Sequence, residues 1–286
     1  MPDSFSKKLE IAFKTKGQLC VGIDPHENLL ADNGFDISAD GLESFSYDML
    51  DQLQDEVSII KPQVSFFERF GSEGFRALEN VLREANERGF LVIADAKRGD
   101  IGSTMEAYGQ AWLAKDAPFV CDALTVNPYL GVGALSSAVA FASERGKGLF
   151  VLAATSNLDG LRLQSSMNNG ATVASQIAQE VETLNINTAI SNSRFGSVGL
   201  VVGATVNLKQ IGIDSLNADR ESLRTSILAP GFGYQGVELS RAKEIFGEVS
   251  GDVIYTVSRS ALRNGIEAVA SSVRQDQETL KLALAQ

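Results

Sequence analysis

Eight short apolar segments alternate with helical patterns along this chain, and this alternation constrains the fold more than any other feature. The segments are as long as strands and lack polar alternation, as expected for strands buried on both faces. They cover residues 19–23, 57–60, 90–94, 123–126, 149–153, 198–202, 226–228 and 253–257. The helical patterns cover residues 42–53, 74–87, 134–145, 173–184, 238–246 and 261–284. This order predicts a parallel sheet covered by helices, and eight repeats favour a closed (β/α)8 barrel over an open sheet.

The length of the chain suits one such barrel. Its 286 residues are close to the roughly 250 that are typical of the fold. No linker divides the chain, so the sequence predicts a single α/β domain over residues 1–286. Polar segments interrupt the pattern near residues 156–170 and 185–197. The first follows the fifth strand on the side of barrel active sites, and we expect a binding or lid loop there. We expect the second to be a peripheral insertion.

Composition narrows the possible partners. The net charge of −11, from 25 basic and 36 acidic residues, argues against nucleic acid or an anionic membrane surface as a partner. No apolar segment is long enough to span a membrane, and the first residues resemble no secretory signal, so we expect a cytoplasmic protein. Cys20 and Cys121 fall in apolar segments and predict buried thiols. His26 is the only histidine, which excludes a His-rich metal site.

The third predicted strand ends in alternating charges, Asp95-Ala96-Lys97-Arg98-Gly99-Asp100. Residues two apart on a strand share a face, so Asp95 and Lys97 point the same way. Asp100 follows a glycine, where the backbone can fold back towards Lys97. An ammonium between two carboxylates is costly to desolvate. We therefore interpret this segment as a catalytic site rather than a structural ion pair.

Other polar side chains stand where the remaining strands end, at the face that carries the active sites of such barrels. Asp24 ends the first strand, Lys61 ends the second, and Ser156 follows the fifth. Asn127 follows the fourth strand. A contact with substrate and a turn before Pro128 explain that asparagine equally well.

The loops after the last two strands predict a phosphate site, which barrels of this kind often build there. Residues 231–236 are rich in glycine and include Gly233 and Gln235, and such a loop exposes backbone N–H groups to an anion. Arg259 ends the eighth strand, and its guanidinium can donate two hydrogen bonds to phosphate oxygens. The glycines alone would indicate only a tight turn, whereas the added arginine favours phosphate binding.

The segment Asp95-Ala96-Lys97-Arg98-Gly99-Asp100-Ile101, with Thr104 shortly after it, resembles the Asp-x-Lys-x-x-Asp-Ile signature of orotidine 5′-phosphate decarboxylases. Residues 125–131, 155–157, 230–236 and 258–259 are similar to the longer bacterial branch of that family. The resemblance implies a (β/α)8 barrel that works as a homodimer without metal or cofactor. It also implies the decarboxylation of orotidine 5′-phosphate to uridine 5′-phosphate in pyrimidine synthesis.

The resemblance also implies a role for each matching residue near the reacting carbon. Asp95 would lie beside the substrate carboxylate, and Lys97 would donate the proton. Lys61 would pair with Asp95 and hold a ribose hydroxyl. Asp100 and Thr104 would reach into the active site of the neighbouring subunit. The chain has no motif for a pyridoxal or thiamine cofactor, so fixed charges would have to stabilise the carbanion.

At the binding end, the resemblance implies that Asp24 holds a ribose hydroxyl and that Ser156 reads the pyrimidine ring. Gln235 and Arg259 would bind the phosphate. One departure from the family pattern follows Asn157, where Leu158 replaces the expected proline. This departure leaves Ser156 itself in place.

Three other functions compete with this interpretation. A Schiff-base aldolase needs a neutral lysine, whereas nearby carboxylates favour the charged form of Lys97. The metal-dependent sugar-phosphate branch of the same superfamily carries a glutamate where this chain has Lys61, a cation hostile to a divalent metal. A phosphate-binding barrel without catalysis is disfavoured because Asp95, Lys97 and Asp100 are all present.

Overall fold

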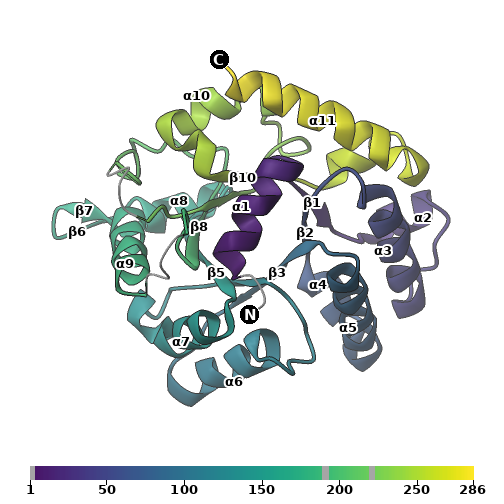
Figure 1. Ribbon diagram of the computed structural model, residues 1–286, viewed down its shortest axis with the longest axis horizontal. Helices are drawn as coiled ribbons and strands as arrows, with labels where there is room; N and C mark the ends of the chain where they lie inside the picture. The colour runs from purple at the N-terminus through teal and green to yellow at the C-terminus, as the bar shows by residue number, and fades with distance from the viewer. Residues whose placement is uncertain (1–3, 189–192, 219–222) are drawn as a thin grey trace.

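The structure is a computed structural model that describes residues 4–188, 193–218 and 223–286. Its centre is a closed barrel of parallel strands ringed by helices (Figure 1). The strands are β1 (Leu19–Ile23), β2 (Ile59–Pro62), β3 (Leu91–Arg98), β4 (Ala123–Val126), β5 (Gly148–Ala154), β8 (Val198–Val202), β9 (Ile227–Ala229) and β10 (Val253–Val257). Pairing of β1 with both β2 and β10 closes the barrel. The predicted (β/α)8 fold is confirmed.

Most strand positions agree with the apolar segments, and the two clear differences lie at charged strand ends. β2 starts and ends two residues later than predicted, because Lys61 and Pro62 pair with Gly22 and Ile23 of β1. β3 continues through the charged residues as far as Arg98. A strand predicted from apolar residues ends at the first lysine or aspartate. The real strand continues, because that side chain has a partner inside the barrel.

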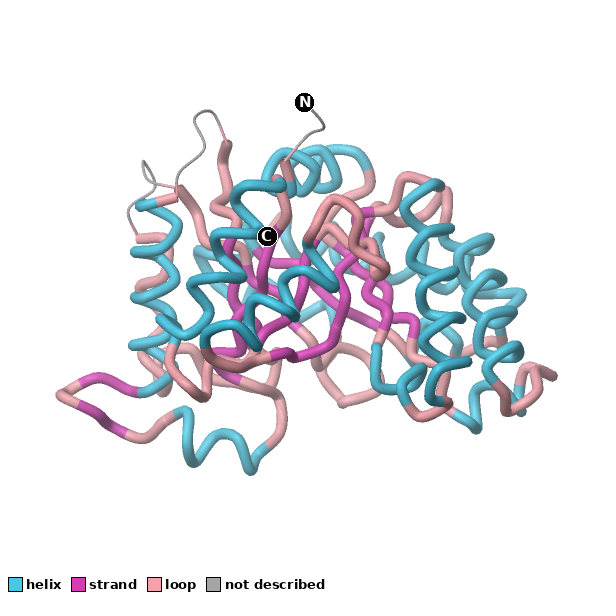
Figure 2. Tube along the Cα trace, turned by 90° about the horizontal axis from the view of Figure 1, so that it is seen from below, coloured by secondary structure: helices cyan, strands magenta, loops and turns pink. Residues whose placement is uncertain are grey.

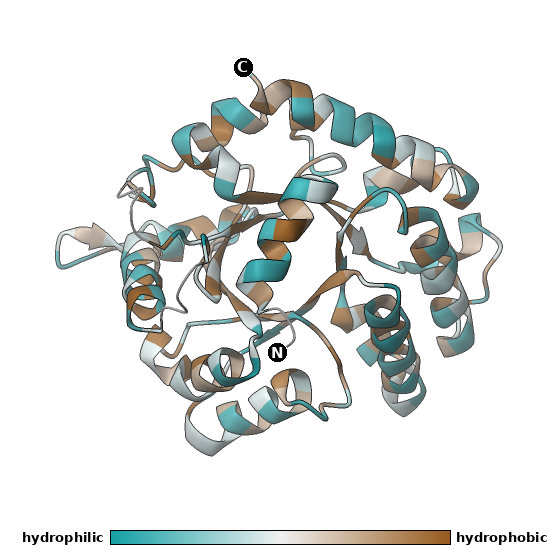
Figure 3. Ribbon diagram, in the orientation of Figure 1, coloured by the Kyte–Doolittle hydropathy of each residue, from teal (hydrophilic) through white to brown (hydrophobic). Residues whose placement is uncertain are grey.

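The main helices around the barrel are α3 (Ala39–Leu53), α5 (Gly71–Glu87), α6 (Gly102–Leu113), α7 (Ser136–Arg145), α9 (Val173–Asn187), α10 (Ala242–Phe246) and α11 (Val269–Leu284). Two short helices, α2 (Glu27–Asp32) and α4 (Val64–Glu68), follow β1 and β2. No helix was predicted over the residues of α6. Residues 261–268, predicted as helix, instead contain 3-10 turns around Gly265, whose φ of 82° an α-helix does not allow. Figure 3 shows mostly hydrophobic barrel strands and helices of mixed hydropathy around them.

The polar segment near residues 156–170 is folded rather than irregular. It contains α8 (Leu158–Gln164) and most of a hairpin of β6 (Met167–Asn168) and β7 (Ala171–Thr172). Figure 2 shows this hairpin projecting beyond the barrel on the side opposite the N-terminus. The other polar segment, 185–197, begins in α9, and its residues 189–192 lie outside the described residues. Asn185 within it is buried and holds the backbone of Val198 through hydrogen bonds in both directions.

An N-terminal helix that the sequence analysis did not predict, α1 (Phe5–Thr15), closes the floor of the barrel. It lies across the barrel centre in Figure 1. Phe5, Leu9 and Ala12 are buried against the inward-facing layer of the barrel, where Phe5 meets Phe150 edge to face. Ser4 caps the helix by accepting a hydrogen bond from the Lys7 N–H. The apolar face of α1 seals the end of the barrel that lies opposite the candidate site.

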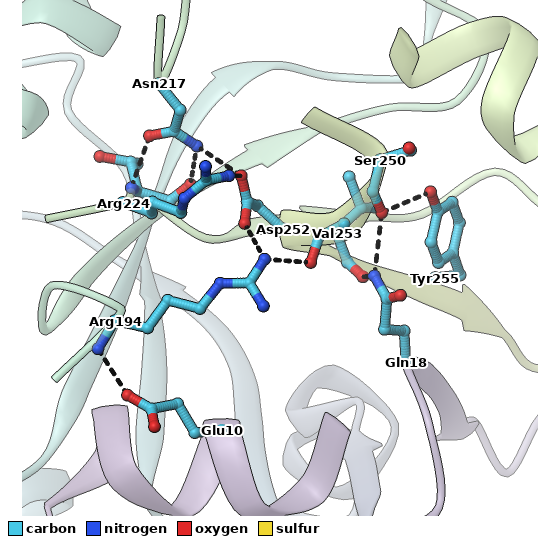
Figure 4. Close-up of polar contacts among 11 residues, drawn as sticks. Glu10, Gln18, Arg194, Asn217, Arg224, Ser250, Asp252, Val253 and Tyr255 are labelled. Carbon is cyan, nitrogen blue, oxygen red and sulfur yellow. Dashed lines mark hydrogen bonds and ion pairs between the residues drawn. The ribbon is translucent and has the colours of Figure 1, made fainter. Parts of the chain in front are cut away.

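The same end of the barrel carries a buried ionic cluster (Figure 4). Asp252 is fully buried just before β10, and its two oxygens accept hydrogen bonds from Arg194 and Arg224, each at 2.6 Å. Asn217 donates a third hydrogen bond, at 3.2 Å. The backbone N–H of Arg194 donates to Glu10 of α1. The cluster therefore joins the entrances of β8, β9 and β10 to the floor helix.

Both cysteines are free and buried, as predicted, and burial raises the pKa of each thiol to about 12. No helix in the described ranges is both long and apolar enough to cross a membrane.

Candidate active site

A cavity of about 300 Å³ opens at the carboxyl ends of the barrel strands. Functional groups of (β/α)8 barrels gather at this face. The predicted site residues that line it are Asp24, Lys61, Asp95, Lys97, Ser156, Gln235 and Arg259. Side chains from β1, β2, β3 and β5 and from the loops after β9 and β10 thus converge on one space.

Asp95 is the centre of the polar contacts in this cavity. Its Oδ2 accepts a hydrogen bond from Lys61 Nζ at 2.9 Å, and its Oδ1 accepts one from Lys97 Nζ at 2.6 Å. The side chains of Asp95 and Lys61 are only 11% and 7% exposed, whereas that of Lys97 is 45% exposed. Lys61 and Asp95 therefore form a desolvated pair, and Lys97 presents its ammonium to the cavity.

The charged forms of this pair stabilise each other. Burial alone would raise the pKa of Asp95, but the Lys61 and Lys97 ammonium groups more than offset it and hold that pKa well below its usual range. Burial alone would lower the pKa of Lys61, but the carboxylates of Asp95 and Asp24 outweigh it and raise that pKa. At neutral pH the cavity therefore contains a fixed carboxylate between two ammonium groups.

We expect Lys61→Met to lower the free energy of unfolding by about 3 kcal/mol at pH 7, because it leaves the buried Asp95 carboxylate without one partner. The pKa of Asp95 is lower in the folded chain, so its contribution is complete above about pH 4 and is lost on further acidification. The pKa of Lys61 is higher in the folded chain, so its contribution is lost only above about pH 10. Denaturant unfolding of wild type and variant at pH 7 and pH 3 measures the difference in the free energy of unfolding at each pH. The exposed Lys115, changed to Met, is the control, and equal stability at pH 7 would contradict the expectation.

Asp24 lines the cavity, and only one of its two carboxylate oxygens has a hydrogen-bond partner among the described residues. Its Oδ2 accepts a hydrogen bond from the Ser258 hydroxyl at 2.6 Å. Its Oδ1 is buried and has no hydrogen-bond partner among the described residues. An unpartnered buried carboxylate oxygen is costly to the folded chain.

The loops after β9 and β10 form the part of the cavity that suits an anion. The guanidinium carbon of Arg259 lies 3.6 Å from the centroid of the Tyr234 ring, so the planar donor group is stacked. Gly233 has a φ of 75°, and a Cβ there would lie 2.2 Å from Ser260 Oγ. Only glycine fits this turn, which brings Gln235 to the cavity beside Arg259.

Besides Gly233, three predicted site residues do not line the cavity of this chain. The Asp100 carboxylate accepts a hydrogen bond from the next backbone N–H, that of Ile101, at 2.8 Å. In the part of the chain that the structure describes, no ion pair joins Asp100 to Lys97, so the expected fold-back within one chain is not seen. Thr104 is exposed on α6. Asn127 holds a turn by accepting a hydrogen bond from the Tyr129 N–H at 3.0 Å.

The loop after β5 explains the departure at Leu158. This residue is the first of α8 and is 83% exposed. The first position of a helix also favours proline, so leucine there keeps the same local structure. The side-chain amide of Gln164, at the end of α8, accepts a hydrogen bond from the Thr155 backbone N–H and donates one to the Thr155 hydroxyl, each at 2.9 Å. The loop is thus held in place next to Ser156, which lines the cavity.

Several polar residues without a predicted role also line this cavity, among them Thr125 and Tyr234. Thr125 stands on the same end of β4 as Asn127, and its small side chain gave no chemical signal. Tyr234 lies inside the glycine-rich loop, where its contact with Arg259 depends on the folded turn. No group of three or more His, Cys, Asp or Glu side chains is placed to hold a metal ion among residues 4–188, 193–218 and 223–286.

Comparison with known proteins agrees with this geometry. The model of the orotidine 5′-phosphate decarboxylase / HUMPS family matches residues 17–273. The chain belongs to this family. The orotidine 5′-phosphate decarboxylase of Corynebacterium glutamicum strain R is 43% identical over 263 residues, which cover 92% of this chain and 91% of that protein. The corresponding enzyme of Streptomyces coelicolor is 41% identical over 288 residues and covers 99% and 98%.

Solved structures of the decarboxylase family share the fold along the whole chain. A crystal structure from Streptomyces avermitilis has a TM-score of 0.90 at 41% identity and covers 99% of this chain and 97% of that one. The structure of Leishmania donovani OMP decarboxylase has a TM-score of 0.78 at 28% identity, with coverage of 99% and 100%.

Proposed function

We propose that this chain decarboxylates orotidine 5′-phosphate to uridine 5′-phosphate, a step of pyrimidine synthesis. The observation that carries the proposal is the Lys61–Asp95–Lys97 chain of charges, set in a cavity that Arg259 lines as well. The relatives that are about 42% identical over nearly the whole chain are named for this activity, which supports the same function here.

Electrostatics explain how such a site would work. Loss of carbon dioxide from the pyrimidine leaves a carbanion in the ring plane, where the π-system cannot delocalise the charge. We propose that Asp95 lies beside the substrate carboxylate, so that their repulsion ends as carbon dioxide leaves. Lys97 stabilises the developing negative charge and then protonates the carbon. Both lysines keep Asp95 ionised, so these charges are in place before the substrate binds.

The remaining contacts would bind and orient the nucleotide. We propose that Asp24 and Lys61 hold ribose hydroxyls, that Ser156 reads the pyrimidine, and that Gln235, Gly233 and Arg259 hold the phosphate. The position of Asp24 and Lys61 in the cavity lining supports the first assignment. Asn127 follows the carboxyl end of β4, and we propose that its turn shapes the rim of the cavity. Binding energy from the phosphate can then be used at the reacting carbon.

Loss of the substrate ultraviolet absorbance tests the function directly. We expect turnover of orotidine 5′-phosphate by the purified chain, with the same rate in the presence of a chelator. Lys61 supports this expectation, because its ammonium lies where the sugar-phosphate branch would place a metal-binding carboxylate. No turnover would overturn the proposal. Turnover that the chelator abolishes would favour the metal-dependent alternative.

Arg259→Ala should raise the KM for orotidine 5′-phosphate about 100-fold, because a charge-assisted two-pronged contact is lost. Uridine, which lacks the phosphate, should bind the variant and the wild type equally. Steady-state kinetics and calorimetry measure the two effects. Arg274→Ala is the matched control, because Arg274 is exposed on α11. An unchanged KM would contradict the phosphate assignment.

We propose that the enzyme is a cytoplasmic homodimer with a shared active site. Exposed apolar side chains support a second copy as the partner: Ile101, Tyr129 and Leu130 are 60%, 77% and 54% exposed beside Asp100. Such residues gather at protein interfaces. A partner on this surface would bring Asp100 and Thr104 to the neighbouring cavity. Two free thiols support a reducing compartment.

A further inference from the structure

The backbone of β3 is distorted where it carries the charged residues. Ala94 pairs with Leu124 and Arg98 pairs with Val126, so four steps along β3 match only two along β4. Lys97, inside this bulge, has a φ of 49°, which is unusual for a residue with a side chain. A bulge leaves backbone groups without ladder partners. Another group must therefore hold the Lys97 backbone in this conformation.

The Thr125 hydroxyl is that group. Its oxygen accepts a hydrogen bond from the backbone N–H of Lys97 at 2.9 Å and donates one to Asp95 Oδ1, also at 2.9 Å. Thr125 is 1% exposed on β4, opposite the bulge. The single hydroxyl is thus used both as donor and as acceptor. It ties the strained backbone of one charged residue to the carboxylate of the other.

We propose that Thr125 is a positioning residue for the decarboxylation, holding Lys97 and Asp95 in register through its hydroxyl. The inference rests on the proposed function. Asp95 Oδ1 also accepts a hydrogen bond from the Lys97 ammonium at 2.6 Å, so two donors meet at one oxygen. Loss of the hydroxyl would leave the Lys97 N–H unpaired and would free the bulge to relax. The ammonium would then lose its fixed place against the carboxylate.

Thr125→Val and Thr125→Ser separate this role from simple packing. Valine keeps the shape and loses the hydroxyl, whereas serine keeps the hydroxyl. We expect Thr125→Val to lower kcat about 10- to 100-fold, the effect of one lost hydrogen bond to a charged group. The dissociation constant for uridine 5′-phosphate should stay within about threefold, because the phosphate contacts lie elsewhere. Thr125→Ser should restore most of kcat.

Thr225→Val is the matched control. Thr225 is also a fully buried threonine, and its hydroxyl accepts a hydrogen bond from Asn185 near the opposite end of the barrel. It should reduce thermal stability as much as Thr125→Val does and leave kcat unchanged. A kcat of Thr125→Val within twofold of wild type would overturn the inference while leaving the proposed function intact. Equal loss of kcat in the serine and valine variants would also overturn it.

Hydrogen exchange of the Lys97 amide gives a second measurement that does not depend on turnover. The amide should be protected in wild type and Thr125→Ser and should exchange faster in Thr125→Val. Unchanged exchange would overturn the inference. If the wild-type chain did not decarboxylate the nucleotide, the proposed function and the assigned role of Thr125 in it would both fail. The exchange result would then report only on the hydrogen bond.

Discussion

Lys97→Ala should lower kcat by about 10,000-fold, because the variant loses both the proton donor and the positive charge beside the developing carbanion. Uridine 5′-phosphate should still bind within about tenfold of wild type, since Arg259 and Asp24 remain. Single-turnover decay of the substrate absorbance and calorimetry with the product measure the two quantities. The split between lost turnover and retained binding identifies a group that acts mainly in the transition state.

The matched control for this experiment is Lys115→Ala, which removes an exposed lysine from the segment between α6 and β4. Its rate should equal that of wild type. A Lys97→Ala variant that keeps a rate within tenfold of wild type would exclude Lys97 as the proton donor. Loss of product binding in parallel with turnover would instead indicate a damaged cavity.

A hybrid dimer of one Lys97→Ala subunit and one Asp100→Ala subunit should recover about half of the wild-type activity. Each parent homodimer should be nearly inactive. In the hybrid, the subunit with an intact Lys97 receives an intact Asp100 from its neighbour, and the other site carries both changes. The prediction rests on the proposed homodimer and on the position of Asp100, whose carboxylate accepts a hydrogen bond from its own Ile101 N–H and does not line the cavity of its own chain.

Two different affinity tags allow the hybrid to be purified and assayed apart from both parents. A hybrid of wild-type and Lys97→Ala subunits, which also keeps one intact site, sets the expected activity. If the mixed hybrid were as inactive as its parents, Asp100 and Lys97 of one subunit would serve the same site. A monomeric protein in solution would remove the basis of the shared site.

The fold could be predicted from the sequence because the barrel strands are buried on both faces. Continuous apolar segments such as 198–202 identify such strands without reference to tertiary contacts. The helix α1 was missed because it precedes the repeating pattern, and its apolar face is explained only by the barrel floor that it covers. The helix α8 was missed because it buries no residue at all.

The charged centre of the site was predictable in part, for a similar reason. Regular strand alternation predicted the pairing of Asp95 with Lys97, and the structure contains that pair, although Lys97 lies in a bulge of β3. The placement of Thr125 depends on a bulge that changes the register between β3 and β4, and a sequence pattern does not reveal register. The position of Asp100 also could not be predicted, because its carboxylate turns to the start of α6.

The floor helix α1 limits how ligands can enter and leave the barrel. Its buried face and the packed layer above it leave no passage downward through the described part of the barrel. The cavity opens at the other end of the barrel, where residues 155–157 lead into α8, and we expect nucleotide and product to pass through this opening. A compound bound at that opening would block the entry of substrate and the exit of product together. It would need no contact with the charged residues deeper in the cavity.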